Sequence, residues 1–533
     1  MDQGNSRRSF LGACLAGGAL ASTRSSAAPP AGDRPQGVFN VRDFGAVATG
    51  KTVTTKALQA AIDAAAQGGG VVYFPPGTYL SGTLTLRSHV SLFLESGAVL
   101  LGSTDLADYP PIRSELRNYT EVYANQSLIY GENLEDIALL GRGTINGQGA
   151  SFKRAEHYGN RPYLMRIVNC RHVQVADLTI LDSPMWVQHY LGCEDVSIHG
   201  LTVHSRCNGN NDGIDIDACD KVRISGCEIW SGDDAIVLKS TLDRPCRDVV
   251  VTNCVLSSLC NALKLGTESV GGFANIAISN CTIYDTHLAG IALESVDGGV
   301  LENVSVSNIV MRNVAGPIFL RLGNRARPPY EGAPKPGLGS FRNVVISDVQ
   351  VSGPSKTTCT IAGLAERAIE NVTLQNIRVE FTGGGTAADA AREIPELPTA
   401  YPEYNMFGVL PASGFYCRHV KNLQLLNTQV TLAREDARPA LVCENASGLR
   451  VSDFTAPSSN PLMALRNTRD VWLDSNRAPE GNEVYLRLEG GASANVALAE
   501  NNLRASKRPI DLGPGVRPEA VLLSPPLEPY RGA

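Results

Sequence analysis

The sequence predicts an all-β protein folded as a parallel β-helix, a solenoid in which each turn of the chain lies on the previous one. A short phrase recurs along the chain, each copy alternates apolar and polar residues, and Asn, Asp and Gly separate the copies. Alternation is the period of a strand with one buried face. A repeat near 25 residues is typical of a solenoid, because one unit buries its apolar face only when neighbours stack on it.

The recurring phrase begins with a polar residue and continues with alternating aliphatic residues. Its copies begin at His172, Asp195, Lys221, Asp248, Asn275, Asn303, Asn343, Asn371 and Asn422. The successive steps are 23, 26, 27, 27, 28, 40, 28 and 51 residues, so two steps carry insertions, near 322–340 and 382–411. Insertions in a solenoid form loops on one side, often the binding side. The Leu/Asn spacing and helical segment of a leucine-rich repeat are absent.

The residues before the repeats divide into a predicted targeting segment and a predicted cap. Residues 1–30 contain Ser-Arg-Arg-Ser-Phe-Leu at 6–11, then a short apolar run and small residues suited to cleavage. This order predicts a twin-arginine signal peptide and export to a periplasm or beyond. Residues 31–85 are expected to hold the cap and the first rungs, since 54–63 form an amphipathic helical pattern. Such a helix would cover the exposed edge of the first rung.

The repeats place the β-helix catalytic domain at 86–445, and the phrase becomes fainter at 446–533. That last segment completes the coil or forms a separate cap; the sequence leaves both readings open. The chain has 533 residues, net charge −6 and 43% hydrophobic residues, enough for a large core. The acidic balance argues against nucleic acid or an anionic membrane as partner, and no apolar run after the N-terminus is long enough to span a bilayer. We expect a monomer.

The cysteines are expected to be core residues. Twelve remain after Cys14, and an exported protein could pair them as disulfides. However, Cys227, Cys254 and Cys281 recur every 27 residues, which favours buried small apolar side chains stacked along a solenoid. No Cys or His spacing typical of zinc is present, so no metal site is predicted.

A second run aligns rung by rung and supplies the candidate site. Its copies begin at Asp212, Asp234, Asn261, Ala289 and Gly316, in steps of 22, 27, 28 and 27 residues. Alternation assigns two inward columns, Ile214, Ile236, Leu263, Ile291, Ile318 and Ile216, Leu238, Leu265, Leu293, Leu320. The same alternation assigns two outward columns, Asp215, Val237, Lys264, Ala292, Phe319 and Asp217, Lys239, Gly266, Glu294, Arg321.

Three carboxylates gather where this run begins: Asp212 on one rung, and Asp233 and Asp234 on the next. Like charges one strand spacing apart raise one pKa while leaving the others ionised. Cleavage of a glycosidic bond needs one protonated donor beside carboxylates that activate water. Acidic residues in such turns also cap backbone amides or bind a cation, but three on one groove favour catalysis.

The motif Asn210-Asn211-Asp212, followed by Ser231-Gly232-Asp233-Asp234, resembles glycoside hydrolase family 28, the polygalacturonase and rhamnogalacturonase family. The resemblance spans about residues 38–430 and includes segments at 39–45 and 183–186. It implies a right-handed parallel β-helix that hydrolyses with inversion and without a metal or organic cofactor. By resemblance, Asp233 is the general acid, while Asp212 and Asp234 orient and deprotonate the attacking water. Room for that water implies roughly 6.5–9.5 Å between acid and base.

Two departures from the family put plain galacturonan in doubt. Cys260-Asn261-Ala262 stands where polygalacturonases have Gly-His-Gly, and Ala292-Leu293-Glu294 stands where they have Arg-Ile-Lys. In the family those basic residues hold the substrate carboxylate. One hypothesis is that Lys264 and Arg321, in the same columns on neighbouring rungs, replace them, so that an acidic or mixed pectic glycan is still bound. The alternative is that both cations pair with Glu268 and Glu294.

The candidate substrate-binding residues are Lys264, Asn261, Glu294, Arg321, Glu268 and Arg325. Aromatic residues of the second insertion, Tyr401, Tyr404 and Phe407, are candidate stacking platforms. The sequence therefore predicts an exported, inverting glycoside hydrolase acting on a pectin-type polysaccharide or oligosaccharide, with no cofactor. The alternatives are a polysaccharide lyase or epimerase, which would need Ca²⁺ and a Lys or Arg base, and a non-catalytic glycan-binding β-helix protein.

Overall fold

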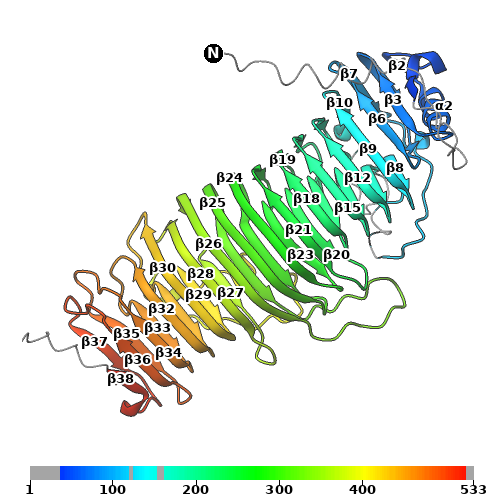
Figure 1. The fold of residues 1–533 in the computed structure, drawn as a ribbon. Coiled ribbons are helices and arrows are strands. Elements are labelled where there is room, and N and C mark those ends of the chain that lie inside the picture. Colours follow the sequence, from blue (N-terminus) through cyan, green and yellow to red (C-terminus); the bar gives the residue numbers. More distant parts are fainter. Residues whose placement is uncertain (1–36, 119, 121–123, 153–160, 524–533) are drawn as a thin grey trace, which may run out of the picture.

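The computed structural model describes residues 37–118, 120, 124–152 and 161–523, so the predicted signal peptide at 1–30 lies outside the described residues. The chain forms an elongated coil of strands that runs from the N-terminal helix at one end to β38 at the other (Figure 1). Neighbouring strands pair in parallel from one rung to the next, as in β14 with β17 and β17 with β20. The predicted parallel β-helix is confirmed.

The coil has three faces, each made by one stack of parallel strands. The site stack contains β5 Leu84–Thr85, β8 Ser127–Glu132, β11 Tyr163–Val168, β14 Gln188–Leu191, β17 Ile214–Asp217, β20 Ile236–Ser240, β23 Leu263–Ser269, β27 Cys359–Ala362, β29 Phe415–Arg418, β31 Leu441–Glu444, β33 Met463–Arg466, β35 Val484–Glu489 and β37 Arg508–Leu512. The strands β24 Phe273–Ser295 and β25 Val300–Leu322 run through the bends and contribute to all three faces.

The other two stacks close the coil. The second stack contains β1 Gly37–Asn40, β3 Gly70–Phe74, β6 Val90–Leu94, β9 Glu135–Gly141, β12 Arg171–Ala176, β15 Glu194–His199, β18 Asp220–Ser225, β21 Cys246–Thr252, β32 Ser447–Thr455, β34 Arg469–Asp474, β36 Ala494–Ala499 and β38 Val521–Leu523. The third stack contains β2 Thr49–Val53, β4 Gly77–Ser81, β7 Ala98–Gly102, β10 Thr144–Asn146, β13 Thr179–Leu181, β16 Thr202–Ser205, β19 Glu228–Ser231 and β22 Val255–Ser258. Both stacks share β26 Ser340–Ser355, β28 Ile369–Phe381 and β30 Val420–Leu432.

The first residue of the recurring phrase turns the chain into the second stack. In all nine copies that residue has a positive φ, between 53° and 59°. Asn and Asp tolerate this left-handed conformation better than other residues with a side chain. The asparagines also bond to one another: the Nδ2 atoms of Asn303 and Asn343 donate to the amide oxygens one rung earlier, at 3.2 and 3.1 Å. The phrase therefore marks a corner of the coil.

The interior is filled by the predicted aliphatic columns. Ile214 pairs with Ile236, Leu263 with Ile291, and Ile291 with Ile318, and all five are buried. The twelve cysteines among the described residues are free thiols, and Cys227, Cys254 and Cys281 are buried in this core. They act as small apolar side chains rather than as cross-links.

The predicted capping helix is confirmed as α2 Thr55–Ala65, and Figure 1 shows it at the N-terminal end beside β2 and β3. It buries Leu58 and Ile62 against the first rung. The hydroxyl of Thr54 accepts a hydrogen bond from Val47 instead of capping the helix. At the other end, strands of residues 446–523 continue the site stack and the second stack. The remaining short helices are η1 Val41–Phe44, η2 Leu106–Asp108, η4 Gly149–Ser151, η5 Pro518–Ala520 and α3 Ala387–Ala390.

The two insertions behave differently. Residues 323–339 contain no helix or strand, whereas 382–411 holds α3 and packs on the outer face of the site stack. That packing forms a second apolar cluster outside the coil, which contains Ala289, Ala292, Phe319, Ala362, Ile394, Phe407, Leu410, Ala412, Tyr416 and Val442. Within the described residues, no helix is long and apolar enough to cross a bilayer.

Candidate active site

The turns between the third stack and the site stack hold the three predicted carboxylates. Asp212 ends the turn before β17, and the side chain of Asn211 fixes that turn from within. Its Nδ2 donates to the carbonyl oxygens of Ser183 and Met185 at 2.8 and 3.1 Å, and its Oδ1 accepts from the backbone N–H of Asn208 at 3.0 Å. The asparagine of the motif thereby sets the position of Asp212 on the previous rung's backbone.

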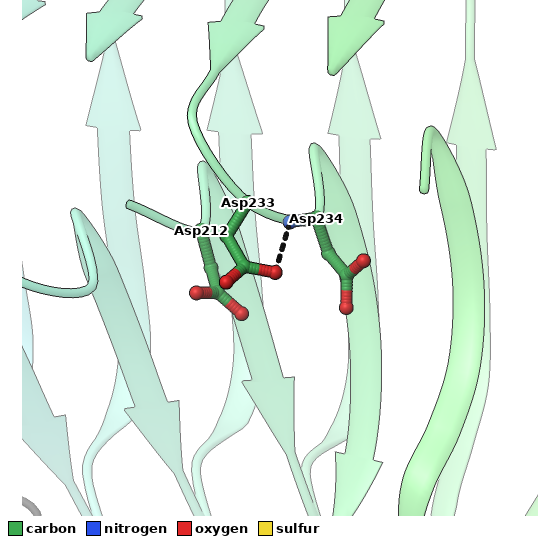
Figure 2. A group of neighbouring side chains, drawn as sticks. All are labelled: Asp212, Asp233 and Asp234. Atoms are coloured by element: carbon green, nitrogen blue, oxygen red, sulfur yellow. Dashed lines mark hydrogen bonds between the residues drawn. The ribbon is translucent and has the colours of Figure 1, made fainter. Parts of the chain in front are cut away.

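The next turn presents Asp233 and Asp234 at the start of β20. Two hydroxyls, from Ser231 and Ser258 on successive rungs, each donate to the carbonyl oxygen of Asp233 at 2.6 Å. The backbone N–H of Asp234 donates to Oδ1 of Asp233 at 3.0 Å. Figure 2 shows the three carboxylates side by side on the same side of these turns. The structure brings the trio together, as expected from the rung alignment.

The three carboxyl groups are close enough to share protons. One oxygen from each of Asp212, Asp233 and Asp234 lies within 4.8 Å of the other two. The roughly 6.5–9.5 Å expected between acid and base is therefore not met by these oxygens.

Two buried lysines balance this negative charge. Nζ of Lys239 lies 3.6 Å from Asp212 and 3.4 Å from Asp215, and it also contacts the ring of Trp186 at 4.6 Å from the centroid. Nζ of Lys264 lies 3.2 Å from Asp234. Burial alone would lower the pKa of both ammonium groups, but the surrounding carboxylates raise it instead, so both stay charged.

Surroundings push the pKa values of the three acids apart. Burial, followed by repulsion from Asp234, raises the pKa of Asp233. Burial, followed by repulsion from Asp215 and Asp233, raises the pKa of Asp212 well above its usual range. Burial acts in the same direction on Asp234, but Lys264, Lys239 and two hydrogen bonds from Asn261 outweigh it and lower its pKa. The pKa of Asp234 is therefore shifted downward, whereas the pKa values of Asp233 and Asp212 are shifted upward.

The carboxylates open into a cavity of about 280 Å³. Its walls are Met185, Trp186, Asn210, Asp212, Asp233, Asp234, Lys239, Lys264, Thr267, Glu268, Arg327 and Tyr401. Both insertions contribute, since Arg327 comes from 322–340 and Tyr401 from 382–411. A small, polar, half-open cavity of this kind suits a sugar better than an apolar ligand.

Of the six predicted substrate-binding residues, two line the cavity: Lys264 and Glu268. Asn261 and Glu294 lie beneath it. Asn261 donates to Oδ1 of Asp234 through its backbone N–H and Nδ2, at 3.1 and 2.8 Å, and accepts from the N–H of Ala289 at 2.9 Å. Burial raises the pKa of Glu294 to about 8, and its carboxyl group lies 3.9 Å from Nζ of Lys264. Both residues hold other side chains in place.

The two predicted arginines lie outside the cavity, contrary to expectation. Arg321 is 2% exposed and donates to the backbone carbonyls of Glu396 and Leu397 at 2.8 and 3.0 Å, and to two carbonyls of the next rung. It fastens the 382–411 insertion to the coil. Arg325 pairs with the buried carboxylate of Asp297. Neither guanidinium replaces the family's basic residues at the cavity.

The outward column is also interrupted where it was expected to continue to Gly266. The pairing of β20 with β23 shifts by two residues, so Ser240 faces Ser269 after Leu238 has faced Leu265. This irregularity brings Glu268 to 3.4 Å from Nζ of Lys239. The alternative that Lys264 and Arg321 pair with Glu268 and Glu294 is met for one pair only, Lys264 with Glu294.

Sequence reasoning missed three contributors to the site. Arg327 lies 3.6 Å from Glu268, and Glu403 lies 3.6 Å from Nζ of Lys264. Asp215, fully buried under Lys239, has its pKa raised to about 8 chiefly by burial. Its place in the outward column gave a signal for Asp215, whereas nothing in the insertions marks Arg327 or Glu403, because they reach the site by folding back over the coil.

The trio has the donor set for a divalent cation, since three carboxylate oxygens converge. However, the ammonium groups of Lys239 and Lys264 lie within 3.6 Å of two of these carboxylates and already supply positive charge. The arrangement suits proton transfer between carboxyl groups better than it suits a metal ion.

Comparison with known proteins decides the family. The pattern of the glycosyl hydrolases family 28 matches residues 77–398, which is more than half of the chain. The chain belongs to glycoside hydrolase family 28. All three aspartates of the cavity lie inside the matched region of this glycoside hydrolase.

Individual relatives agree with this membership. The family 28 chain is 29% identical to a probable polygalacturonase of Vitis vinifera over 66% of its own length and 75% of the relative's. It is also 29% identical to a putative rhamnogalacturonase D of Aspergillus niger, over 54% of its own length and 60% of the relative's. A family 28 exopolygalacturonase of Yersinia enterocolitica superposes with a TM-score of 0.61 at 21% identity, covering 82% of this chain and 78% of that one. This last likeness establishes the shared fold.

Proposed function

We propose that this glycoside hydrolase cleaves glycosidic bonds of a pectin-type polysaccharide or oligosaccharide with inversion at the anomeric carbon. The observation that carries the proposal is the trio of carboxyl groups whose pKa values are pushed apart within one polar cavity. The names of the relatives, a polygalacturonase and a rhamnogalacturonase, support pectic glycan as the substrate class.

In the proposed reaction, each carboxyl group has one task. Asp233 gives its proton to the glycosidic oxygen as the bond from that oxygen to the anomeric carbon breaks. Asp234 accepts a proton from the attacking water, whose oxygen forms the new bond to the opposite face of that carbon. Asp212 hydrogen-bonds to the same water and orients it. The ammonium groups of Lys239 and Lys264 stabilise the negative charge on Asp212 and Asp234 during the proton transfers.

Neighbouring groups support these assignments. The lowered pKa of Asp234 keeps it ionised and able to act as a base, since Lys264 and Asn261 stabilise the carboxylate. The raised pKa of Asp233 keeps it protonated in the acidic range, where pectic carboxylates are still ionised. The two hydrogen bonds from Asn261 and the ion pair with Lys264 hold the carboxylate of Asp234 in place beside the cavity.

The test is hydrolysis of a panel of pectic glycans by the chain and by Asp233→Asn, with Asp195→Asn as a matched control. Asp195 lies on the second stack in an exposed ion pair with Arg223. We expect reducing ends from the unaltered chain and from Asp195→Asn, and at least a ~10³-fold lower rate from Asp233→Asn. Full activity of Asp233→Asn would overturn the assignment.

The same assay separates hydrolysis from elimination. A lyase acting through Ca²⁺ would form unsaturated products, which absorb ultraviolet light where saturated sugars do not, and EDTA would stop it. We expect saturated products and a rate that EDTA leaves unchanged. Unsaturated, chelator-sensitive products would favour the lyase alternative.

We also propose export through the twin-arginine route to the periplasm or beyond. The support is the order of residues in 1–30 alone, with the Arg pair at 7 and 8 followed by an apolar run. Replacing both arginines by lysine should retain the protein in the cytoplasm of the producing cell. Normal export of that variant would contradict the proposal.

A further inference from the structure

A second, larger cavity lies on the same face of the coil. It encloses about 490 Å³ and is lined by Ile112, Arg113, Ser114, Arg117, Ala124, Asn125, Gln126 and Arg166. The described lining residues include three arginines, and none of those described is Asp or Glu, in a chain whose net charge is −6. We call it the cationic cavity. Such a concentration of positive charge in a concave site attracts an anion.

Arg166 is the residue of this cavity best placed to bind an anion. The residue lies on β11, is 5% exposed, and donates Nη1 to the carbonyl oxygen of Ala124 at 3.3 Å. Its Nε and Nη2 are buried and have no hydrogen-bond partner among the described residues. A buried guanidinium with two unsatisfied N–H groups costs free energy unless a ligand accepts them. Both groups belong to the edge that pairs with a carboxylate in a bidentate manner.

The other two arginines are exposed and stand over the cavity from the loop after η2. The guanidinium of Arg117 stacks on the ring of Tyr330, at 4.6 Å from the centroid. No described carboxylate pairs with Arg113 or Arg117 in this structure. Their charges therefore remain available to a ligand.

The cationic cavity and the catalytic cavity lie near each other along the site stack. Arg166 pairs in register with His189, which pairs with Asp215, so the two cavities lie two rungs apart, about 10 Å along the coil. Between them stand Tyr163 and Trp186, with ring centroids 5.7 Å apart. Arg166 contacts the first ring and Lys239 contacts the second.

The first insertion also joins the two cavities. Arg327 lines the catalytic cavity, and Tyr330, three residues later, covers Arg117 at the cationic cavity. One loop thus borders both sites, on the same side of the site stack. The cavities are about 10 Å apart along the coil, so an extended glycan of a few sugar units is long enough to reach both.

We propose that the cationic cavity binds the carboxylate of a uronate residue in the same glycan chain that is cleaved over Asp212, Asp233 and Asp234. This inference rests on the proposed function and narrows its substrate class. Nζ of Lys264 already lies 3.2 Å from Asp234, 3.9 Å from Glu294 and 3.6 Å from Glu403, and Arg321 is fastened to the insertion, so both cations are engaged within the protein. The carboxylate of the substrate is therefore bound about 10 Å from the glycosidic bond that breaks.

The consequence is an unusual division of specificity. The sugar at the scissile bond need not be charged, whereas a uronate a short distance along the chain is required for tight binding. A mixed acidic glycan, or an acidic oligosaccharide, meets this requirement. A neutral glycan of the same length and linkage does not.

The test measures binding to the Asp233→Asn chain, so that the probe is not consumed. The probes are hexagalacturonate, its carboxyl-reduced neutral counterpart, and inorganic phosphate, each titrated by calorimetry. Arg166→Gln and Arg117→Gln are added to that background, and Arg223→Gln, in an exposed ion pair with Asp195, is the matched control. Circular dichroism checks the fold, and Arg117→Gln remains decisive if Arg166→Gln fails to fold, because Arg117 is exposed.

We expect Kd for hexagalacturonate to rise about 10- to 100-fold in Arg166→Gln and several-fold in Arg117→Gln, with no change in Arg223→Gln. The neutral counterpart should bind weakly and equally to all variants. Unchanged hexagalacturonate binding in both cavity variants would overturn the inference. It would also be overturned if the two arginine substitutions weakened the binding of phosphate but not that of hexagalacturonate.

The two proposals fail in different ways. If the unaltered chain releases no reducing ends but hexagalacturonate still binds through Arg166, the proposed function is wrong and the anion site stands. If the chain hydrolyses pectic glycans while Arg166→Gln and Arg117→Gln leave KM unchanged, the proposed function stands and the cationic cavity is not a substrate site.

Discussion

Asp234 illustrates how single residues set the chemistry. It is fully buried, yet Lys264 at 3.2 Å and the amide groups of Asn261 hold its pKa below the usual range of an aspartate. Asp233, next to it in sequence, lacks such cationic contact and has a raised pKa. The pKa values of two adjacent aspartates are therefore shifted in opposite directions because their neighbours differ.

The pH profile tests this difference. Activity needs Asp234 ionised and Asp233 protonated, so the rate is lost as pH falls through the lowered pKa of Asp234 and as pH rises through the raised pKa of Asp233. We expect a bell-shaped dependence of kcat/KM on pH. Lys264→Met removes the largest cause of the lowered pKa, so its acidic limb should move to higher pH.

The matched control for that shift is Lys221→Met. Lys221 makes an exposed ion pair with Glu194 on the second stack, away from the cavity. Its profile should coincide with that of the unaltered chain. An acidic limb that stays in place in Lys264→Met would show that Asp234 is not the base whose ionisation limits the rate.

At the residue scale, the sequence predicted that the three acids lie together and that Lys264 lies near them, but it misplaced Arg321 and Arg325. The Asp trio could be predicted because its members lie next to aligned strands, and register carries them to one place. Lys264 could be placed in its column, but its three carboxylate partners could not be foreseen, since Glu403 comes from residues far along the chain. Charge compensation is a tertiary property and leaves no local pattern.

At the scale of elements, the 382–411 insertion completes the site. It brings Tyr401 to the cavity and Glu403 to Lys264, and it buries the outer face of later rungs at Ala292 and Phe319. Step lengths of the repeat revealed that an insertion exists. They could not show which face it covers, because that depends on the fit of its apolar residues to the outer side of the site stack.

Arg321 is expected to be the main fastener of this insertion. Arg321→Met keeps the apolar stem but leaves the carbonyls of Glu396 and Leu397 without their donor. We expect faster proteolysis within 382–411 and a ~10- to 100-fold lower kcat/KM, because Tyr401 and Glu403 lose their positions. Arg312→Met, which removes only an exposed ion pair with Asp285, is the control.

Limited proteolysis and kinetics, measured together, decide this prediction. If Arg321→Met keeps normal kcat/KM while 382–411 becomes sensitive to protease, the insertion is not needed at the site. If neither property changes, Arg321 does not fasten the insertion.

At the scale of the whole molecule, the coil supplies rigidity through its aliphatic columns. Ile291 pairs with Leu263 below and Ile318 above, and none of the three is exposed by more than 1%. Each rung contacts only its neighbours. A packing defect in one column therefore destabilises the adjacent rungs first, and more distant rungs only through them. The three aspartates, placed on adjacent rungs, depend on that regular spacing.

Ile291→Ala tests the contribution of the column. Deleting the buried side chain leaves a cavity and should lower the free energy of unfolding by about 2–5 kcal/mol. Val310→Ala, at a site that is 46% exposed, should change it by less than about 0.5 kcal/mol. Denaturant titration of both variants gives the comparison, and equal midpoints would contradict a close-packed interior.

The fold as a whole was the most predictable level. The corner residues, the alternating aliphatics and the step lengths all follow from stacking identical turns, so the pattern is repeated many times along the chain. Segments outside the repeat are different: the loop after η2 brings Arg113 and Arg117 to the cationic cavity against β11, and no repeat relates these two arginines to Asp212. Its position emerges only when the chain is folded.

The anomeric configuration of the first product tests the central claim most directly. Proton NMR, recorded within the first minutes of hydrolysis and before mutarotation, resolves the two anomers of the released sugar. Water activated by Asp234 attacks the face opposite the leaving group, so the product should carry the inverted configuration. Product with the configuration of the substrate would contradict the account.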